Sequence, residues 1–486
     1  MESTQSQTEA PTDGKSLRTI SQLPGPPKLP MLGNILQLKA SRVHQDVESM
    51  ARTYGRLFRL TIAKRDLLVV ADHALINNIL RDRPNGFRRP SVVANVSAEM
   101  GAIPGLFLAE GEDWRNQRRM VMHGMAPTTV KNYFPSLVNV ALRLRRRWET
   151  AADKKTDIRL SIDLKRFTVD VIAGLAFGVD VNTIESDEDS IQRHIDVILP
   201  GVARRSMSLF PYWRYIRLPM DRQLEASLKA LQESVSDLIR KARKRMEDNP
   251  SLRDRPGNLL EAMIAAADEN DSGVDDRAIS GNVSTLLIAG EDTTANTLAW
   301  MLYLLHRHPD MLKRAQDEVH RIAPDTAALT IEQMDALDFV EACALEAMRL
   351  KPVAPYMRLE AIHDTAIGDV HVPAGTVVWC VLRHDSVDRN VSPDASEFKP
   401  TRWLQENATA PDGNAAKKAS IPFGAGPRIC PGRYLALLEI KIALAMLLGN
   451  FEIEAVETPD GKDAQELTGF VMSPVGLSMR LRRLKP

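Results

Sequence analysis

The sequence predicts a mainly α-helical protein with a small β portion. Helical periodicity runs through most of the 486 residues, whereas β-type runs are confined to two short stretches, 56–70 and 366–378. Hydrophobic residues make up 44% of the chain and charged residues 26%, which is ordinary globular composition. Neither a repeat nor a linker divides the chain after residue 30, so we expect one large domain.

The N-terminal part differs in composition from the rest. Residues 1–22 are rich in Ser, Thr, Gln and Asp and have no apolar core. This predicts a disordered tail and neither a signal peptide nor a membrane anchor. Residues 23–30 are dense in proline and cannot be helical, so we expect the folded domain over residues 23–486.

Several long helices are expected further along, and one of them stands apart. They cover 131–153, 220–248, 276–308, 331–351 and 435–448. The middle of the helix 276–308 is apolar nearly all round, which is typical of a helix inside a large domain. Two hairpins are expected, one over 56–70 and one over 366–378 that turns at Pro373-Ala374-Gly375.

Charge and cysteine usage narrow the classes of function. The 63 basic and 63 acidic residues cancel, which argues against a nucleic-acid-binding protein because phosphate contacts need a basic surplus. The three cysteines, Cys343, Cys380 and Cys430, form no C-x-x-C pair. This argues against a cysteine zinc site and a disulfide framework, and it favours a reducing, cytoplasmic location. The apolar stretches are too short for an integral membrane segment.

Cys430 lies in a distinctive sequence context. Residues 423–432 read FGAGPRICPG, in which three glycines permit a tight loop. Pro431 is expected to open a helix, which places Cys430 at an N-terminus where the helix dipole and Arg428 lower a thiol pKa. A stabilised thiolate there suits either a nucleophile or a soft metal ligand. The competing interpretation is a buried free cysteine after an ordinary turn.

The loop resembles the haem-binding loop of the cytochrome P450 family, F-x-x-G-x-R-x-C-x-G. Its five fixed positions are matched by Phe423, Gly426, Arg428, Cys430 and Gly432. The resemblance implies a cytochrome P450 fold in a single large haem domain, with haem b (iron protoporphyrin IX) as cofactor. It also implies that the Cys430 thiolate is the axial ligand of the iron.

A second motif lies inside the apolar helix 276–308. Residues 289–294 read AGEDTT and place acids and hydroxyls where burial is costly unless they serve a purpose. The segment resembles the family's A/G-G-x-D/E-T-T motif, which implies that Asp292 and Thr293 relay protons to dioxygen and that Ala289 lies at the haem. The competing interpretation is a kink in a core helix, because Gly290 weakens a helix and a threonine can bond back to its backbone.

Glu346 and Arg349 form an E-x-x-R motif with both side chains on one helical face. Residues 398–403, FKPTRW, resemble the family's P-E-R-F segment, with Thr401 and Trp403 as departures that we expect to affect packing alone. The resemblance implies that Glu346, Arg349 and Arg402 form a buried structural triad.

Position distinguishes this motif from two others with the same spacing. Glu112–Arg115 and Glu318–Arg321 are also E-x-x-R pairs, but only Glu346–Arg349 lies on the predicted helix that comes directly before the second expected hairpin. The other two are expected to be solvated ion pairs.

Trp114 and Arg118 lie four residues apart on a predicted helix, so an indole N–H and a guanidinium share one face. This resembles the family's W-x-x-x-R motif, which implies that both bind haem propionates, with Arg428 as a third partner. Arg358 is a weaker fourth candidate, because the family's spacing would place that arginine at Leu359. For the Trp/Arg pair alone, surface amphipathicity is the competing interpretation.

The resemblance implies a haem-thiolate monooxygenase that inserts one atom of O2 into a small apolar organic substrate, by hydroxylation or epoxidation. Pocket residues are then expected from segments 88–108, 286–289, 353–357 and 470–472. Residues 200–219 are expected to form a lid; their aromatic side chains also permit a membrane-surface contact, but ordinary lid packing is favoured.

Electrons are expected from separate partners, a ferredoxin or flavodoxin with an NAD(P)H-dependent reductase. A basic docking face is expected from a set of cations: Arg115, Arg119, Lys417, Lys418 and Arg433. Two alternatives remain open at this stage. One is a haem-thiolate peroxygenase or isomerase, and the other is a non-catalytic haem or ligand-binding protein.

Overall fold

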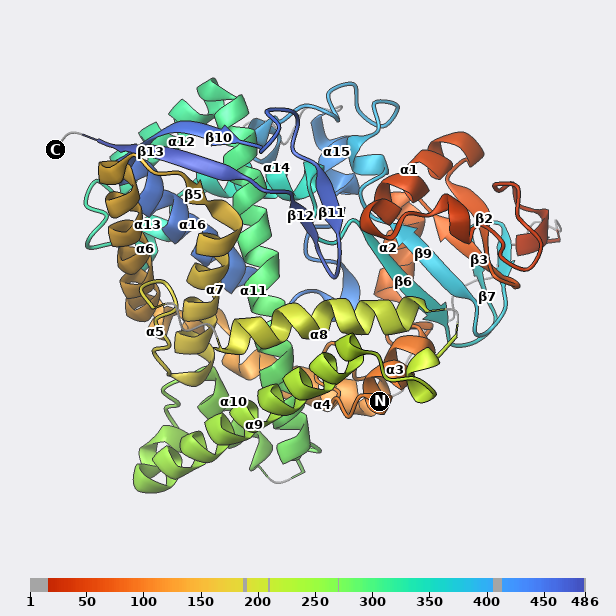
Figure 1. Ribbon diagram of the computed structural model, residues 1–486, viewed down its shortest axis with the longest axis horizontal. Helices are drawn as coiled ribbons and strands as arrows, with labels where there is room; N and C mark the ends of the chain where they lie inside the picture. The colour runs from red at the N-terminus through yellow and green to blue at the C-terminus, as the bar shows by residue number, and fades with distance from the viewer. Residues whose placement is uncertain (1–15, 187–189, 209, 270, 405–412, 485–486) are drawn as a thin grey trace, which may run out of the picture.

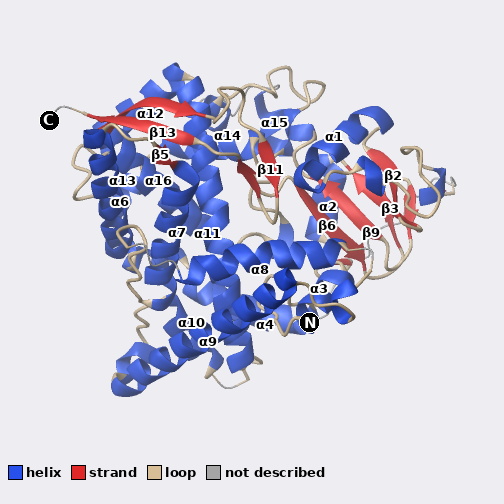
Figure 2. Ribbon diagram, viewed as in Figure 1, coloured by secondary structure: helices blue, strands red, loops and turns tan. Residues whose placement is uncertain are grey.

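The computed structural model describes residues 16–186, 190–208, 210–269, 271–404 and 413–484. Most helices gather on one side of the molecule, and the largest sheet lies on the other (Figures 1 and 2). This arrangement confirms the predicted mainly α class with a small β portion.

Helices account for most of the described chain. In chain order they are α1 Val43–Tyr54, α2 His73–Arg81, α3 Ser91–Glu99, α4 Gly111–Gly124, α5 Pro127–Asn132, α6 Phe134–Lys154, α7 Leu160–Phe177, α8 Ser190–Met207, α9 Pro219–Asp248, α10 Leu259–Ala267, α11 Asp276–Arg307, α12 Pro309–Ile322, α13 Ile331–Asp335, α14 Asp338–Leu350, α15 Gly413–Ala419 and α16 Arg433–Asn450. Among the described residues, none of these helices combines the length and apolar character needed to cross a membrane.

The strands in the described part of the chain form four small sheets. They are β1 Arg18–Thr19, β2 Leu57–Ile62, β3 Arg65–Val70, β4 Phe87–Arg88, β5 Ile158–Arg159, β6 Tyr356–Ala361, β7 Thr365–Ile367, β8 Val370–Val372, β9 Val377–Val381, β10 Phe451–Glu457, β11 Glu466–Thr468, β12 Met472–Pro474 and β13 Ser478–Arg483. The largest sheet has the order β2-β3-β9-β6-β4. Its β2–β3 hairpin is the first one predicted, with Leu57 opposite Val70.

The expected second hairpin is wrong. β8 pairs with β7, whereas β9 lies between β3 and β6 in the largest sheet. The turn at Pro373–Gly375 is therefore a crossover between two sheets, held where the Gly375 N–H donates to the Ala361 carbonyl. Strand alternation alone does not show which neighbour a strand pairs with, and β6 was not predicted at all.

The expected helix 331–351 is divided into α13 and α14. Thr330 caps α13 through a hydrogen bond from the Gln333 N–H. The N-terminus of α14 is capped from a distance, because the Glu318 carboxylate on α12 accepts from the Phe339 and Val340 N–H groups at 2.9 Å each. Glu318 is thus a half-buried helix cap, and the expected solvated ion pair with Arg321 is not formed among the described residues.

Ordered structure begins before residue 23. Arg18 and Thr19 pair with Val370 and His371 on β8, and Ile20 is buried. The predicted disordered tail, residues 1–22, therefore extends too far, because residues 18–22 are ordered. Residues 1–15 of that tail lie outside the described residues.

α11 passes through the helical part of the molecule and packs along α7 (Figure 1). A Cβ at Gly290 would lie 2.9 Å from the Ile172 Cδ1 atom on α7, so glycine permits this close approach. The predicted buried character of this helix is confirmed, since Leu298, Trp300 and Leu305 are fully buried.

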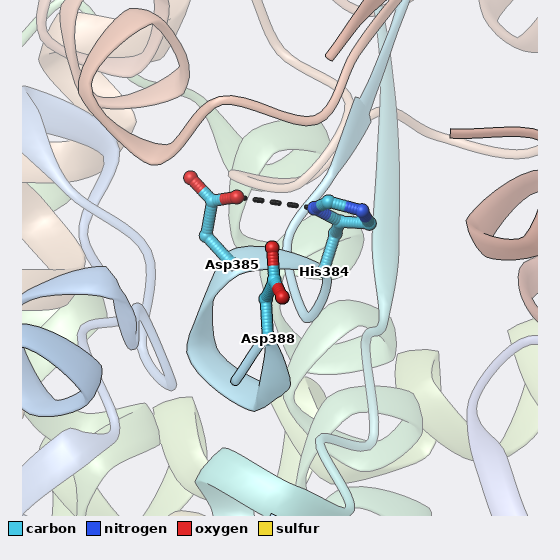
Figure 3. Close-up of side chains that lie close together, drawn as sticks. All are labelled: His384, Asp385 and Asp388. Carbon is cyan, nitrogen blue, oxygen red and sulfur yellow. Dashed lines mark hydrogen bonds and ion pairs between the residues drawn. The ribbon is translucent and has the colours of Figure 1, made fainter. Parts of the chain in front are cut away.

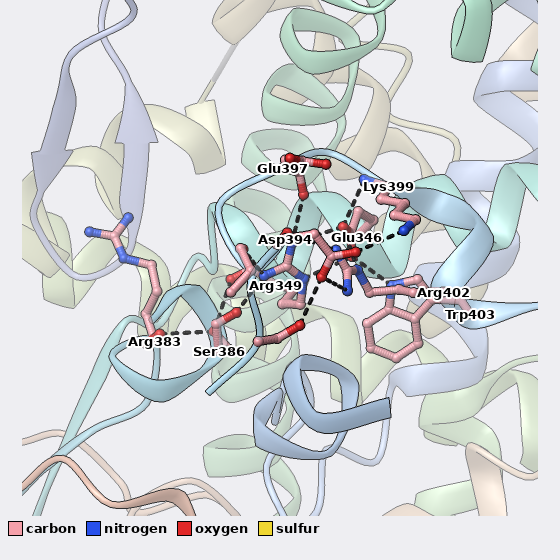
Figure 4. A network of polar contacts seen from close by, with 11 residues as sticks. Glu346, Arg349, Arg383, Ser386, Asp394, Glu397, Lys399, Arg402 and Trp403 are labelled. Atoms are coloured by element: carbon pink, nitrogen blue, oxygen red, sulfur yellow. Dashed lines mark hydrogen bonds and ion pairs between the residues drawn. The ribbon is translucent and has the colours of Figure 1, made fainter. Parts of the chain in front are cut away.

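The predicted triad of Glu346, Arg349 and Arg402 is a buried polar brace (Figure 4). Glu346 Oε1 accepts from Arg349 Nη2 at 2.8 Å and from Arg402 Nε at 2.9 Å, and the three side chains are at most 1% exposed. Arg349 also donates to the carbonyls of Ala395, Glu397 and Ser386. The brace therefore fixes the irregular chain before the Cys430 loop onto α14.

Trp403 belongs to the same brace. Its indole Nε1 donates to Glu346 Oε2 at 2.8 Å (Figure 4). The expectation that this departure from the family pattern affects packing alone is therefore wrong, because an indole supplies a hydrogen bond that phenylalanine cannot.

Replacing Glu346 with Ala should lower the free energy of unfolding by about 3–5 kcal/mol, because it leaves the buried Arg349 without a carboxylate and the buried Arg402 with Asp394 alone. Glu112→Ala is the matched control: it removes the same E-x-x-R spacing from a pair whose side chains are 75% and 45% exposed. That control should cost less than about 1 kcal/mol. Urea unfolding followed by circular dichroism measures both, and equal losses would contradict the buried brace.

Candidate active site

The Cys430 loop is a tight turn ahead of α16. The Cys430 N–H donates to the Phe423 carbonyl at 2.9 Å, and the Ile429 N–H donates to the Gly426 carbonyl at 3.1 Å. The helix begins at Arg433 with Gly432 as its N-cap. Pro431 is therefore not the first helical residue, and Cys430 lies two residues before the cap.

Gly426 is required by its surroundings. Its φ is +69°, and a Cβ there would lie 2.6 Å from the Leu80 carbonyl oxygen at the end of α2. Gly424 also has a positive φ of +75°, but a Cβ there would meet nothing within 4 Å. The loop is thus pressed against α2 at Gly426 and is open at Gly424.

The three cysteines differ in environment. Cys430 is exposed, whereas Cys343 and Cys380 are buried. Burial raises the pKa of Cys380 to about 12 and that of Cys343 well above its usual value. Only Cys430 presents its sulfur outside the core.

The prediction that the pKa of the Cys430 thiol is lowered is wrong when the protein atoms alone surround it. Desolvation by surrounding protein atoms raises the pKa of this thiol. A hydrogen bond from the Gly432 N–H and the charge of Arg118 act in the opposite direction and only partly offset it.

Trp114, Arg118 and Arg428, the three predicted propionate partners, lie close to one another, and Arg118 lies near the Cys430 sulfur. The Arg428 guanidinium lies 4.7 Å from the centre of the Trp114 ring and donates to the Ala109 carbonyl at 2.8 Å. It also forms an ion pair with Glu110. Burial lowers the pKa of Arg118, and the nearby Cys430 opposes this shift.

Two further arginines, Arg83 and Arg89, were not predicted. Burial and the neighbouring charge of Arg428 lower the pKa of Arg83 to about 10. Burial together with Arg83 and Arg428 lowers the pKa of Arg89 to about 9. We call Arg83, Arg89, Arg118 and Arg428 the arginine cluster; Glu110 is the acid that interacts with three of its members. Neither new member belongs to a motif, so only the fold reveals them.

The arginine cluster fits the carboxylates of haem. Arg83 Nε and Nη2 and Arg428 Nε are buried and have no hydrogen-bond partner among the described residues. Buried guanidinium donors are costly without an acceptor. The cluster has four cations and a single acid among its described partners, so anions such as the two haem propionates would balance its charge. The nearby cysteine sulfur is a ligand that can bind the haem iron.

An apolar cavity of about 420 Å³ lies above this region. It is lined by parts of all four segments predicted for the pocket, including Ala289, Val353–Met357 and Phe470–Met472. Residues 202, 203 and 206 of the expected lid also line it. The lid's Phe210 and Tyr215 stack on each other and are exposed.

Arg358 lies in the cavity wall and apart from the arginine cluster. It is on β6 opposite Trp379, and its guanidinium carbon is 6.0 Å from the centre of the Trp379 ring. Leu359, where the family's spacing would place an arginine, is fully buried.

Asp292 and Thr293 face different surroundings. Thr293 lines the cavity, and its Oγ1 donates back to the Ala289 carbonyl at 2.7 Å. Asp292 Oδ1 lies 2.7 Å from Lys165 Nζ on α7. Successive residues on a helix point about 100° apart, so the two predicted relay residues do not touch directly.

Lys165 and Glu439 are polar partners of this motif that the sequence did not reveal. Burial lowers the Lys165 pKa, but Asp292, Asp196 and Glu291 outweigh it and raise the pKa. Burial raises the pKa of Glu439 on α16 to about 8, although Thr294 donates a hydrogen bond to it. The helix itself is continuous here, so the back-bonded Thr293 does not open it.

A separate cluster joins His384, Asp385 and Asp388 (Figure 3). Asp385 Oδ1 accepts from His384 Nδ1 at 3.0 Å and lies 3.3 Å from Arg56 Nε. Its Oδ2 accepts from the backbone N–H and Nδ1 of His73 at 2.9 Å each. Both oxygens are already engaged, so the cluster joins α2 to the chain after β9 and does not resemble a cation site.

Comparison with known proteins agrees with the geometry. A family model described as Cytochrome P450 matches residues 23–481. A self-sufficient cytochrome P450 monooxygenase of Oidiodendron maius (strain Zn) is 30% identical over 456 residues, covering 92% of this chain and 41% of that protein. Protein LUTEIN DEFICIENT 5, chloroplastic, of Arabidopsis thaliana is 26% identical over 474 residues, covering 95% of this chain and 78% of that protein. The crystal structure of the cytochrome P450DA heme domain aligns with a TM-score of 0.82 at 26% identity, covering 97% and 99% of the two chains.

The fold and the site together define a haem protein with a cysteine ligand loop. The chain belongs to the cytochrome P450 family, and its cofactor is haem b. The chain spans about two fifths of the length of the curated relatives that it matches first.

Replacing Gly426 with Ala should disrupt the Cys430 loop, because the new methyl group would overlap the Leu80 carbonyl in addition to the cost of a positive φ. Gly424→Ala is the control, since it carries only the conformational cost of about 1–2 kcal/mol. We expect G426A protein to retain much less haem per chain and to melt at a lower temperature than G424A. Haem content and thermal unfolding measure this, and identical behaviour of the two variants would contradict the close contact.

Proposed function

We propose that this protein is a haem-thiolate monooxygenase that inserts one atom of O2 into an apolar organic substrate and releases the other as water. The observation that carries the proposal is the exposed Cys430 sulfur, because Arg428 of the arginine cluster lies in the same loop and Arg89 of that cluster lines the apolar cavity. In this arrangement Cys430 would be the iron ligand, and Arg83, Arg89, Trp114, Arg118 and Arg428 would hold the propionates. Phe423, Gly426 and Gly432 would shape the loop, and Ala289 would lie at the cofactor.

When bound, the haem supplies the oxidative chemistry. The chain's contribution would begin with Cys430, whose thiolate would hold the iron and make it more electron-rich. The Gly432 N–H supports this role, because a donor to the sulfur favours its ionised form. The apolar walls of the cavity exclude water and orient the substrate.

Proton delivery is assigned to Thr293 and Asp292. Thr293 is the member of this pair that lines the cavity, and its hydroxyl hydrogen, which bonds to the Ala289 carbonyl, would have to rotate away from that carbonyl to be donated into the cavity. Asp292 is held on the α7 side by Lys165 and would resupply the proton through Thr293 or through water.

Electrons are proposed to come from a separate ferredoxin or flavodoxin and an NAD(P)H-dependent reductase. Exposed cations on α4 and at the start of α16 support a basic docking face, namely Arg115, Arg119 and Arg433. Lys418 on α15 is exposed, while Lys417 is partly covered against Trp403. A cytoplasmic location is proposed because the three cysteines are unpaired.

Replacing Cys430 with Ala should abolish the red-shifted Soret band of the reduced carbon monoxide complex, because that band requires a thiolate ligand. Cys343→Ala and Cys380→Ala are controls, since both remove a buried sulfur away from the cavity. They should retain the band and the NAD(P)H-dependent product. A wild-type protein without the band, or one that forms product only from peroxide, would contradict the proposed monooxygenase.

Replacing Thr293 with Ala or Asp292 with Asn should reduce the yield of product per O2 consumed, with peroxide released in its place. General acid catalysis of this kind contributes roughly a hundredfold or more to a rate. Thr297→Ala is the matched control, because Thr297 makes the same backbone bond one turn later, at 2.8 Å, away from the cavity wall. Oxygen-electrode and product measurements would contradict these roles if T293A stayed as coupled as T297A.

A further inference from the structure

We propose that Glu466 is a positioning residue for the substrate cavity. It anchors the β11–β12 hairpin to α1, so that the hairpin forms a fixed wall that limits how bulky a substrate the cavity accepts. The inference rests on the proposed function in one respect only, namely that this cavity is where the substrate binds. Glu466 itself is not among the described residues that line the cavity, so it acts through the hairpin.

The hairpin contributes one wall of the cavity. It lies between the helical side of the molecule and the largest sheet (Figure 1). Residues 468–472 at its tip all line the cavity. Phe470 at the tip meets Phe107 from the chain between α3 and α4, with the ring centres 5.8 Å apart. A shift of the hairpin would therefore change both the size of the cavity and the contact with Phe107.

Little apolar packing holds strand β11. Glu466 and Thr468 are half-buried, and Leu467 between them is exposed. The strand pairs with β12 alone, in a two-stranded sheet, and an isolated hairpin is at best marginally stable in water. β12 has its own support, since Met472 is buried and its N–H donates to the Val353 carbonyl at 2.8 Å. β11 depends instead on the polar contacts of Glu466 and Thr468.

Glu466 makes most of these contacts. Its Oε2 lies 2.7 Å from His44 Nε2 and accepts from Gln45 Nε2 at 2.9 Å, both on α1. Its Oε1 accepts from Lys351 Nζ at 2.6 Å and from Arg383 Nη1 at 2.8 Å. Burial raises the pKa of Glu466, but these partners outweigh it and lower the pKa, so the carboxylate is ionised. Charge-assisted hydrogen bonds of this kind are strong and fix one geometry.

His44 holds the same strand at a second point. Its Nε2 contacts Glu466, and its Nδ1 contacts the Thr468 hydroxyl. Residues two apart in a strand lie on one face, so a single imidazole engages both. The His44 side chain is fully buried, which keeps the ring in place on α1. The position of β11 is therefore set by α1.

A second acid in this region makes the effect of Glu466 separable from stability. We call His44, Glu48, Lys351, Arg383 and Glu466 the anchor cluster. Glu48 on α1 accepts two hydrogen bonds of 2.8 Å each from Arg383, and it is 5% exposed where Glu466 is 6% exposed. Among the described residues, Glu48 makes no hydrogen bond or ion pair with the hairpin. Loss of either acid therefore disturbs the anchor cluster, but only loss of Glu466 releases β11.

The test measures the binding of iron-coordinating ligands of increasing size to the haem-containing protein, by the shift of the Soret band. Imidazole, 4-phenylimidazole and 4-(4-biphenylyl)imidazole share one coordinating ring and differ in aromatic bulk. In Glu466→Gln, the dissociation constant of the biphenylyl ligand divided by that of the phenyl ligand should fall about tenfold, because the released wall admits the larger group. Affinity for imidazole should stay unchanged.

Glu48→Gln is the matched control. It removes an acid of the same burial from the anchor cluster, so it should lower stability and leave the ratio of the two dissociation constants unchanged. A purely structural role of Glu466 would move the ratio in neither variant. An unchanged ratio in E466Q, or an equal fall in E48Q, would overturn the inference.

Lys351→Met tests the inference even if E466Q does not fold. The Lys351 side chain is 25% exposed and does not belong to the cavity lining described above, and methionine keeps most of its apolar stem. With one cation of Glu466 lost, the ratio should fall about threefold, whereas Lys351→Arg should keep the wild-type value. If E466Q does not fold, a wild-type ratio in K351M would overturn the inference.

Ligand binding and turnover separate this inference from the proposed function. None of the three ligands requires turnover. A Glu466-dependent ratio without O2-dependent product would refute the monooxygenase proposal and leave this inference standing. O2-dependent turnover in a protein whose ratio ignores Glu466 would do the reverse.

Discussion

The site is governed by an imbalance of charge beside an exposed thiol. Arg83, Arg89, Arg118 and Arg428 lie close together, a single acid, Glu110, interacts with three of them, and several of their buried donors have no acceptor among the described residues. Burying uncompensated cations is costly, so this arrangement makes sense only with an anionic cofactor. In the proposed function, the two propionates of haem would pair with these cations, and the iron would bind the Cys430 sulfur. The same few side chains therefore affect both cofactor binding and the stability of the fold.

Positioning these groups requires the rest of the fold. The arginine cluster comes from the chain after α2, from α4 and from the Cys430 loop, which are far apart in sequence. Glu346 fixes the preceding irregular segment onto α14 through two arginines and an indole. Gly426 lets the loop press against the end of α2. Each contact places one wall of the cofactor site.

Much of the site could be predicted from sequence because its parts are short motifs with fixed spacing. Cys430, Trp114 and Arg118 and the triad around Glu346 lie where the motifs indicated. The long apolar helix was also predictable, because a helix with apolar residues on nearly all sides is expected to be buried.

The remainder depended on contacts between distant segments. Lys165 pairs with Asp292 from another helix, and Glu318 caps α14 across a gap in sequence, so no local pattern shows either. β9 pairs with β3 and β6 and not with its neighbour β8, which alternation alone cannot determine.

The most direct test of this account compares haem with haem dimethyl ester, each added to protein produced in haem-deficient cells. The two molecules share the iron and the ring, and esterification removes the charge of each propionate while adding one methyl group to it. Neutralisation of the arginine cluster predicts that haem binds about a hundredfold more tightly, the effect of two charge-assisted contacts. Equal affinity of the two would contradict the central claim that the arginine cluster exists to hold the cofactor's carboxylates.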